Sequence, residues 1–332
     1  MRDGIEASSD RGERSAAAPR FGLCCTFLVE PIRFRTTTAT FVSTLPARER
    51  NRHLRRIALH NAATLVEAVE WCAAHGIGAY RVKSQLLPLL THPVFGYELA
   101  ALDTRGEVEK ALRKARKLAA RRQLRLSFHP DQFVVLGSAN EAVVRSSVAE
   151  LDAQAVVAEL IGAEQLTIHG GGAQDGKRAA LERLARGIDR LSGRARTRLA
   201  LENDDRIYTV RDLLPVCDRQ GVPLVYDVHH HRCNPDGLDE REATDAAGAT
   251  WGKREAWVHL SSPSGGWKAA TPRHHADYID ARDVPASWRG RRITIDVEAK
   301  AKELAVLALK GRWPARTAAG PRRVDRPRAP SG

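Results

Sequence analysis

The stretch PLVYDVHHHRCNP (residues 223–235) joins a short apolar run to an aspartate and three consecutive histidines. The apolar run has the length and composition of a buried β-strand. Carboxylate and imidazole groups are costly to bury unless something binds them. A polar cluster directly after a buried strand therefore indicates a functional site at the end of that strand.

Short apolar strands alternate with longer helical patterns along the rest of the chain. The predicted helices include residues 59–75, 107–123, 141–162 and 176–193. The predicted strands cover residues 21–28, 78–82, 124–129, 165–169, 198–203, 223–228, 256–260 and 292–298. Such β–α units in order predict an α/β fold, a (β/α)8 TIM barrel of about 290 residues. An open doubly wound sheet is the alternative, but no glycine-rich phosphate loop follows the first strand.

Composition sets the class of protein. The chain has 332 residues and 43% hydrophobic content, enough for one barrel domain over residues 21–310, with disordered segments at 1–20 and 311–332. No apolar run approaches the ~20 residues that cross a bilayer, and the N-terminus lacks the apolar centre of a signal peptide. We therefore expect a cytoplasmic monomer with no membrane partner. The five cysteines are scattered and form no CxxC pair, which argues against disulfides and a zinc knuckle.

A net charge of +13 indicates a polyanionic partner. The excess lies in three basic runs, RERNRHLRR (48–56), RKARKLAARRQLR (113–125) and KGRWPARTAAGPRRVDRPR (310–328). Each run alone reads equally well as a solvated surface or tail. Together they favour nucleic acid over a neutral substrate.

Acids and imidazoles stand at the ends of several predicted strands. They are His129, His169, Glu202, Asp227, His259 and Glu298. In a TIM barrel the carboxyl ends of the strands converge on the face that carries the active site. The sequence therefore predicts a metal site on that face, since scattered core histidines would not select the same end of every strand.

Imidazoles mixed with carboxylates, without thiolates, suit Zn²⁺ or Mn²⁺. Asp227 and His230 can converge on one ion across the loop that leaves the barrel. His229 and His231 then point elsewhere, and at least one of them supports the ligands or faces DNA. Cys233 is a further candidate for zinc. The candidate ligands outnumber those that one ion needs. We therefore expect two or three ions that share carboxylates, as in enzymes that hydrolyse phosphodiesters. A basic chain with such a rim reads as a nuclease.

Seven motifs, in order and spacing, resemble the UV damage endonuclease family over roughly residues 21–310. They are FHPDQFVVLGS (128–138), LTIHGGG (166–172), LALENDDR (199–206), YDVHHHRCNP (226–235), VHLSSP (258–263), HHADYID (274–280) and VEAKAKELA (297–305). The resemblance implies a barrel related to the abasic-site endonucleases with trinuclear centres. It also implies nicking of double-stranded DNA on the 5′ side of cyclobutane dimers and 6–4 photoproducts, with Mn²⁺ favoured over Zn²⁺ or Mg²⁺.

The resemblance also implies roles for individual residues. The implied metal ligands are His129, His169, Glu202, Asp227, His230, His259, His275 and Glu298. Glu202 and Glu298 would bridge ions and, with His129, carry the chemistry. Gln132 and Phe133 would probe the lesion, the ring stacking in the gap left by extruded bases. His92 matches a position near the metals, and the roles of His229, His231 and His274 stay open.

One position departs from the family pattern. Family members carry a lysine, which can be carboxylated to bind metal, two residues before the histidine that corresponds to His259. Trp257 stands there in this chain, with Lys253 as a displaced counterpart only if the strand register changes. An indole offers no lone pair to a metal, so we expect fewer than three firmly bound ions.

Three other functions compete with the nuclease. An abasic-site endonuclease would share the barrel and the ions. A sugar isomerase or epimerase would need fewer ligands and has no use for the positive charge. A catalytically inactive binder of damaged DNA has only Trp257 in its favour.

Overall fold

The computed structural model describes residues 19–313, and the expected tails lie largely outside this range. Its centre is a closed barrel in which each of eight strands pairs in parallel with its neighbours in sequence order. The strands are β1 (Arg20–Cys24), β2 (Ala79–Val82), β3 (Arg125–Phe128), β4 (Gln165–His169), β5 (Leu199–Glu202), β6 (Leu224–Asp227), β7 (Ala256–Leu260) and β8 (Ile293–Val297). The predicted barrel is confirmed, and the doubly wound alternative is wrong.

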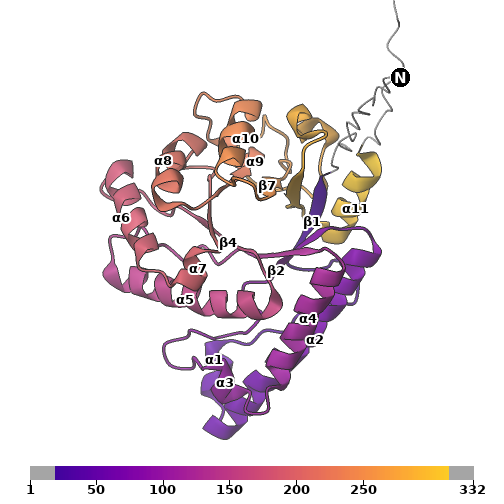
Figure 1. Ribbon diagram of the computed structural model, residues 1–332, viewed down its shortest axis with the longest axis vertical. Coiled ribbons are helices and arrows are strands. Elements are labelled where there is room, and N and C mark those ends of the chain that lie inside the picture. Colours follow the sequence, from indigo (N-terminus) through magenta and orange to yellow (C-terminus); the bar gives the residue numbers. More distant parts are fainter. Residues whose placement is uncertain (1–18, 314–332) are drawn as a thin grey trace, which may run out of the picture.

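Helices surround the barrel (Figure 1). They are α1 (Ala39–Ser43), α2 (Ala47–Ala74), α3 (Leu99–Leu102), α4 (Glu107–Arg121), α5 (Glu141–Ile161), α6 (Lys177–Asp189), α7 (Gly193–Arg196), α8 (Val210–Gln220), α9 (Val228–Cys233), α10 (Glu240–Ala249) and α11 (Lys302–Arg312), with the 3-10 turns η1 (Ala281–Asp283) and η2 (Ala286–Trp288). Among these described elements, no helix is both long and apolar enough to cross a bilayer.

Local chemistry explains where these elements begin and end. The first strand was predicted to reach residue 28, but β1 ends at Cys24 because Cys25 adopts a positive φ of 66°. The predicted helix 176–193 ends earlier, at Asp189, and a separate helix α7 begins at Gly193, where Ser192 caps it by accepting from Ala195 N. The helix predicted over residues 59–75 starts earlier, at Ala47.

The helix α4 shows how the sequence produces an outer wall. Apolar side chains at Val108, Leu112 and Ala115 recur at helical spacing and are buried. The carboxylate of Asp103 accepts from the backbone N–H groups of Glu107 and Glu109, both at 3.0 Å, and so satisfies the free donors of the first turn. The apolar face packs against the barrel and α2, and the opposite face is left to charged residues.

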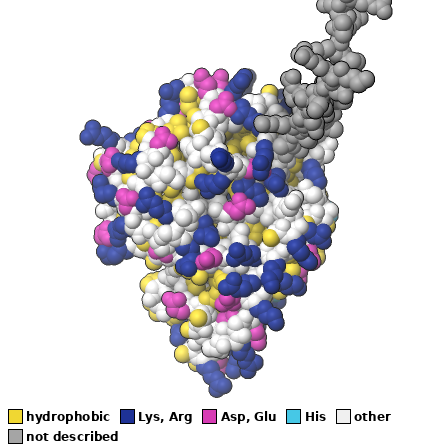
Figure 2. All heavy atoms as spheres, in the orientation of Figure 1, with side chains coloured by type: hydrophobic (Ala, Val, Ile, Leu, Met, Phe, Trp, Pro, Cys, Tyr) yellow, Lys and Arg dark blue, Asp and Glu magenta, His cyan; other side chains and the backbone are white. Residues whose placement is uncertain are grey.

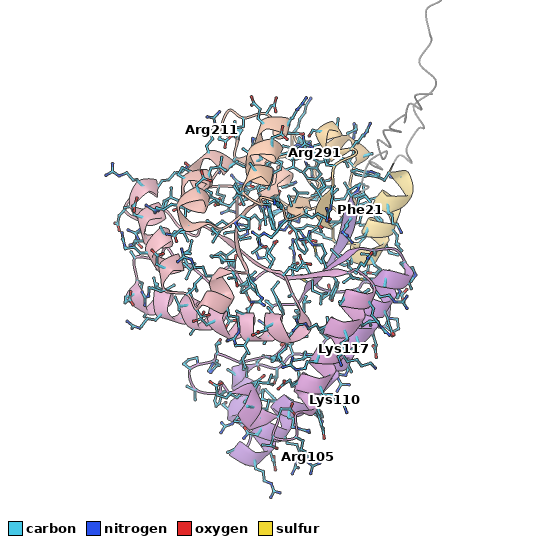
Figure 3. All side chains as sticks on the ribbon, in the orientation of Figure 1. Phe21, Arg105, Lys110, Lys117, Arg211 and Arg291 are labelled. Carbon is cyan, nitrogen blue, oxygen red and sulfur yellow. The ribbon has the colours of Figure 1, made fainter. Side chains whose placement is uncertain are left out.

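That opposite face carries a stripe of cations. Lys110, Lys114, Lys117 and Arg121 are exposed at helical spacing, and none has an ion-pair partner among the described residues. Lys and Arg side chains spread over the face seen in Figure 2, including the side along which α2 and α4 run. Figure 3 shows Lys110 and Lys117 along α4, with Arg105 just before it. Most of the predicted basic run 113–125 is therefore exposed on the surface, but its last residue, Arg125, is buried in β3.

Inside the barrel, side chains form layers because successive residues of a strand point to opposite faces. One layer contains Ala79, Ala200, Val225 and Trp257, each from a different strand. Two residues further along these four strands lie Arg81, Glu202, Asp227 and His259, which are buried and polar. The apolar layer thus supports the polar groups at the carboxyl ends of the strands.

Candidate metal centre

The strand-end acids and histidines form two groups that share one residue. Within each group the ligand atoms all lie within 4.8 Å of one another. The first group is His129, His169 and Glu202, and the second is Glu202, Asp227, His259 and Glu298. The predicted convergence of β3 to β8 on one rim is therefore what the structure shows.

Glu202 lies between the two groups and turns one oxygen to each. Its Oε2 is 2.8 Å from His129 Nε2 and 3.8 Å from His169 Nε2. Its Oε1 is 2.8 Å from His259 Nδ1. Burial raises the pKa of Glu202, but His259, His169 and the hydrogen bond from His129 lower it by more, so the carboxylate stays ionised. An ionised carboxylate with divergent oxygens has the form of a bridging ligand.

Several features of this cluster are those expected of a site that binds a metal ion between its ligand atoms. His129 Nδ1 lies 3.1 Å from the carbonyl oxygen of Pro130, and Nε2 lies 2.8 Å from Glu202 Oε2. The ring is thus oriented with Nε2 toward the carboxylate. His169 Nδ1 and Asp227 Oδ2 are buried and have no hydrogen-bond partner. Burial lowers the pKa of His169, which leaves its ring neutral with a lone pair for a metal.

Asp227 is held at the end of β6 by its neighbours on both sides. Asn203, at the end of β5, accepts from Asp227 N and donates to Asp227 O, both at 2.9 Å. Asp227 Oδ1 accepts from His230 N at 2.8 Å and caps α9, which leaves Oδ2 facing the other ligands. Asn203 is a supporting residue that sequence reasoning missed, although it directly follows Glu202 in LENDD.

The three histidines form the short helix α9 rather than the predicted loop. The segment is helical because the side chain of Asp227 caps its first turn and so stabilises the helix. His230 Nδ1 donates to Asn203 O at 2.9 Å and lies 3.7 Å from Asp227 Oδ2. Burial lowers the pKa of His230, but Asp227, Glu202 and Glu298 raise it by more, to about 9.

The other two histidines of this helix point elsewhere, as predicted. The His231 ring lies 2.6 Å from the Tyr226 hydroxyl, through Nδ1. The His229 ring packs against Trp267 and His275, with centroids 5.1 Å apart in both pairs. Both side chains are buried, His229 beside His275 and His231 beside Tyr226, so neither is part of the exposed surface.

Glu298 and His275 complete the rim from the side of β8. Glu298 Oε1 lies 3.4 Å from His259 Nδ1, and Oε2 lies 3.7 Å from His275 Nδ1. His275 comes from the segment between β7 and β8, where it pairs with Pro263 in an isolated bridge. It is near Glu298 but outside both groups of ligand atoms, and His274 contributes its backbone carbonyl to Ser264 N.

Cys233 lies at the end of α9 and belongs to neither group. Burial raises the pKa of its thiol to about 11. Because it lies outside both groups of ligand atoms, it is a poor candidate for a metal ligand.

Trp257 shares the inward face of β7 with His259, as strand alternation predicts, but it belongs to the apolar layer. Its side chain is fully buried, and the Arg125 guanidinium lies 3.9 Å from the ring centroid. Lys253 is exposed before β7 and lines a hollow with Arg20 and Arg292, at the opposite end of the strands. The suggested replacement of the family lysine by Lys253 is therefore wrong, because the register of β7 does not shift.

Gln132 and Phe133 lie on the segment after β3, three and four residues beyond His129. Both are exposed, and Phe133 is 75% exposed, so its ring does not pack under the loop. Phe133, Asp131 and His92 line a cavity of about 380 Å³. His92 is outside both metal groups, and its Nδ1 accepts from Val94 N and Phe95 N at 3.2 Å.

Arg81 and Asp296 reach the same rim and were not expected there. Arg81 Nε lies 3.1 Å from Asp296 Oδ2, and both side chains are buried. A Cβ at Gly22 would lie 2.1 Å from Asp296 Oδ1, so only glycine leaves room for this carboxylate. The available signal was an arginine and an aspartate in the middle of apolar strands, where a charge needs a partner.

The chain is similar over most of its length to proteins named UV DNA damage endonucleases. The sequence model of the family described as UV-endonuclease UvdE matches residues 19–316. The UV DNA damage endonuclease of Deinococcus radiodurans is 38% identical over 315 residues, covering 89% of this chain and 95% of that protein. That of Nostoc sp. is 31% identical over 312 residues, covering 90% and 92%. The crystal structure of SacUVDE matches with a TM-score of 0.77 and 27% identity, covering 89% of this chain and 99% of that chain.

Proposed function

The chain belongs to the UV-endonuclease UvdE family, and we propose that it is a metal-dependent DNA repair endonuclease. It nicks double-stranded DNA on the 5′ side of cyclobutane dimers and 6–4 photoproducts. Mn²⁺ is the proposed metal, with two or three ions per chain and with Zn²⁺ or Mg²⁺ as alternatives. The observation that carries the proposal is the position of Glu202, shared by two groups of ligand atoms.

The ligand set supports this chemistry residue by residue. His129, His169 and Glu202 would hold one ion, and Glu202, Asp227, His259 and Glu298 the other. When bound, closely spaced divalent ions activate water and stabilise the charge that develops on the phosphate. Asn203 fixes Asp227 through two hydrogen bonds, and Pro130 fixes the ring of His129 through one. His230 and His275 adjoin the second group and would serve a further, weaker ion.

The surface supports DNA as the substrate. The exposed α4 cations Lys110, Lys114, Lys117 and Arg121 have no acidic partners among the described residues and can contact phosphates by releasing counterions. Gln132 and Phe133 extend from the same rim as His129, with an amide to bond a base edge and a ring to stack.

Replacing both Gln132 and Phe133 by alanine is expected to weaken the preference for damaged DNA and to spare metal content. Base–aromatic stacking contributes about 1–3 kcal/mol, so the ratio of irradiated to intact DNA bound should fall roughly tenfold. Competition binding with irradiated and intact duplex of one sequence measures this ratio.

Val156→Ala is the matched control, because Val156 is a large exposed side chain (41% exposed) on α5. It should leave the ratio unchanged. Unchanged discrimination in the Gln132 and Phe133 double variant would remove these residues from lesion recognition.

A plasmid nicking assay tests the proposed function. Irradiated supercoiled plasmid should be relaxed in Mn²⁺ and left intact in chelator, and unirradiated plasmid should stay supercoiled in both. Mg²⁺ and Zn²⁺ are compared in parallel. Cutting of depurinated plasmid in preference to irradiated plasmid would instead identify an abasic-site endonuclease. Retention of irradiated plasmid without nicking would identify an inactive binder, although Trp257, its only support, lies in the apolar layer.

A further inference from the structure

Arg81, in the middle of β2, makes three contacts with the rim of the barrel. Its Nε donates to Asp296 Oδ2 at 3.1 Å, and its Nη1 donates to Glu298 Oε1 at 2.5 Å. Its Nη2 lies 2.8 Å from His259 Nε2. The Arg81 side chain is only 8% exposed, so one buried guanidinium joins two residues of the second ligand group to a carboxylate outside it.

The contact with Glu298 places the arginine in competition with a metal ion. Glu298 Oε1 accepts from Arg81 and also lies 3.4 Å from His259 Nδ1, inside the second ligand group. A divalent ion bound there would use the same carboxylate and would be repelled by the guanidinium charge. One oxygen of Glu298 is thus within reach both of the guanidinium and of an ion held by the second ligand group.

The contact between Arg81 and His259 also places the arginine in competition with a metal ion. An arginine nitrogen only donates, so His259 Nε2 accepts and Nδ1 carries the ring proton toward Glu202 Oε1, 2.8 Å away. An ion held through Nδ1 would place the ring proton on Nε2, which would then no longer accept from Arg81. Asp296 Oδ2, 3.8 Å from Nε2, is the nearby acceptor for that proton.

We propose that Arg81 is a positioning residue that serves as the resident counter-cation of Glu298 and Asp296 and thereby weakens metal binding at the second ligand group. It keeps the buried acids neutralised when the ion leaves, so the centre stays folded and the ion stays exchangeable. This inference rests on the metal dependence proposed above and adds a residue that limits metal affinity.

Arg81→Met separates this role from packing. Removing the guanidinium takes away the cation that directly contacts Glu298 and Asp296, which destabilises the protein in chelator. Mn²⁺ can neutralise the same carboxylates, so the loss should be largely recovered in saturating Mn²⁺. By linkage, the variant should show a larger Mn²⁺-induced rise in Tm than the wild type and should bind Mn²⁺ roughly tenfold more tightly.

Arg125→Met is the matched control. Arg125 is also buried, on the adjacent strand β3, and lies 3.5 Å from Glu255, toward the opposite end of the barrel. Its removal should lower Tm by the same amount in chelator and in Mn²⁺, and leave Mn²⁺ affinity unchanged. Arg81→Lys keeps the positive charge but loses the planar guanidinium. Its Mn²⁺ affinity and its Mn²⁺-induced rise in Tm should lie between those of the wild type and Arg81→Met.

Thermal unfolding and calorimetric titration with Mn²⁺ give distinct outcomes. Equal losses of Tm in chelator and in Mn²⁺ for Arg81→Met, or weaker Mn²⁺ binding, would overturn the inference. Recovery of folded Arg81→Met only in Mn²⁺ would support it, and if that variant never folds, Arg81→Lys decides by the same comparison. A wild-type Tm that does not respond to any of the divalent ions would contradict the proposed metal dependence itself, and the inference with it.

Discussion

Glu202→Gln is expected to reduce nicking of irradiated DNA to less than about a tenth of wild-type activity, because charge loss at a shared ligand weakens both ion sites. The amide keeps the shape of the side chain but loses the charge that holds two cations together. Glu202 contacts His129 and His259 at 2.8 Å through different oxygens, so one substitution disturbs both groups. Binding of irradiated duplex should stay close to wild type, because the exposed probes and cations are untouched.

Metal content and nicking rate, measured on the same preparation, check this result. Glu255→Gln is a matched control, since Glu255 is a buried acid (6% side-chain exposure) at the other end of the barrel, paired with Arg20. It should lower stability and leave metal content unchanged. Glu202→Gln protein that retains full metal content and more than a tenth of the activity would count heavily against Glu202 as the bridging ligand.

Trp257→Lys is expected to destabilise the protein by about 3–5 kcal/mol, because it buries an unpaired ammonium and leaves space around it. The Arg125 guanidinium lies 3.9 Å from the ring that would be lost, so the new charge would adjoin a like charge. Trp257→Phe keeps an aromatic face for Arg125 and should cost much less. Urea unfolding of the three proteins gives the comparison.

Metal analysis of the same variants tests the position of Trp257. Its place in the apolar layer with Ala79, Ala200 and Val225 predicts that neither substitution adds an ion. A folded Trp257→Lys protein that binds an additional ion would show that the side chain at 257 reaches the metal rim. Three tightly held ions in the unmodified chain would show that another residue has taken the place of the family lysine.

The barrel and most of its rim could be predicted from the sequence because both follow from local patterns. Each strand is a short apolar run, and the residue at its end must lie on the carboxyl face once the strands close into a barrel. The residues that follow from this rule are His129, His169, Glu202, Asp227, His259 and Glu298. His275 does not, because it lies on an irregular segment, and only the family resemblance indicated it.

The helix α9 and the Arg81 network could not be predicted by the same rule. α9 depends on a cap from Asp227, and the HHH run has no apolar periodicity that favours a helix. The role of Arg81 depends on its hydrogen bonds to Asp296 and Glu298, which lie more than 200 positions away in the chain. A charged residue inside an apolar strand indicates that a group of opposite charge lies nearby, but only the closed barrel shows which residue this is.

Incision of a DNA duplex that carries one cyclobutane dimer at a known position tests the central claim most directly. End-labelled strands, incubated with wild-type protein in Mn²⁺, should be cut once, on the 5′ side of the dimer, and should remain whole in chelator or with Glu202→Gln. Incision on the 3′ side, or equal cutting of an undamaged duplex of the same sequence, would contradict this account.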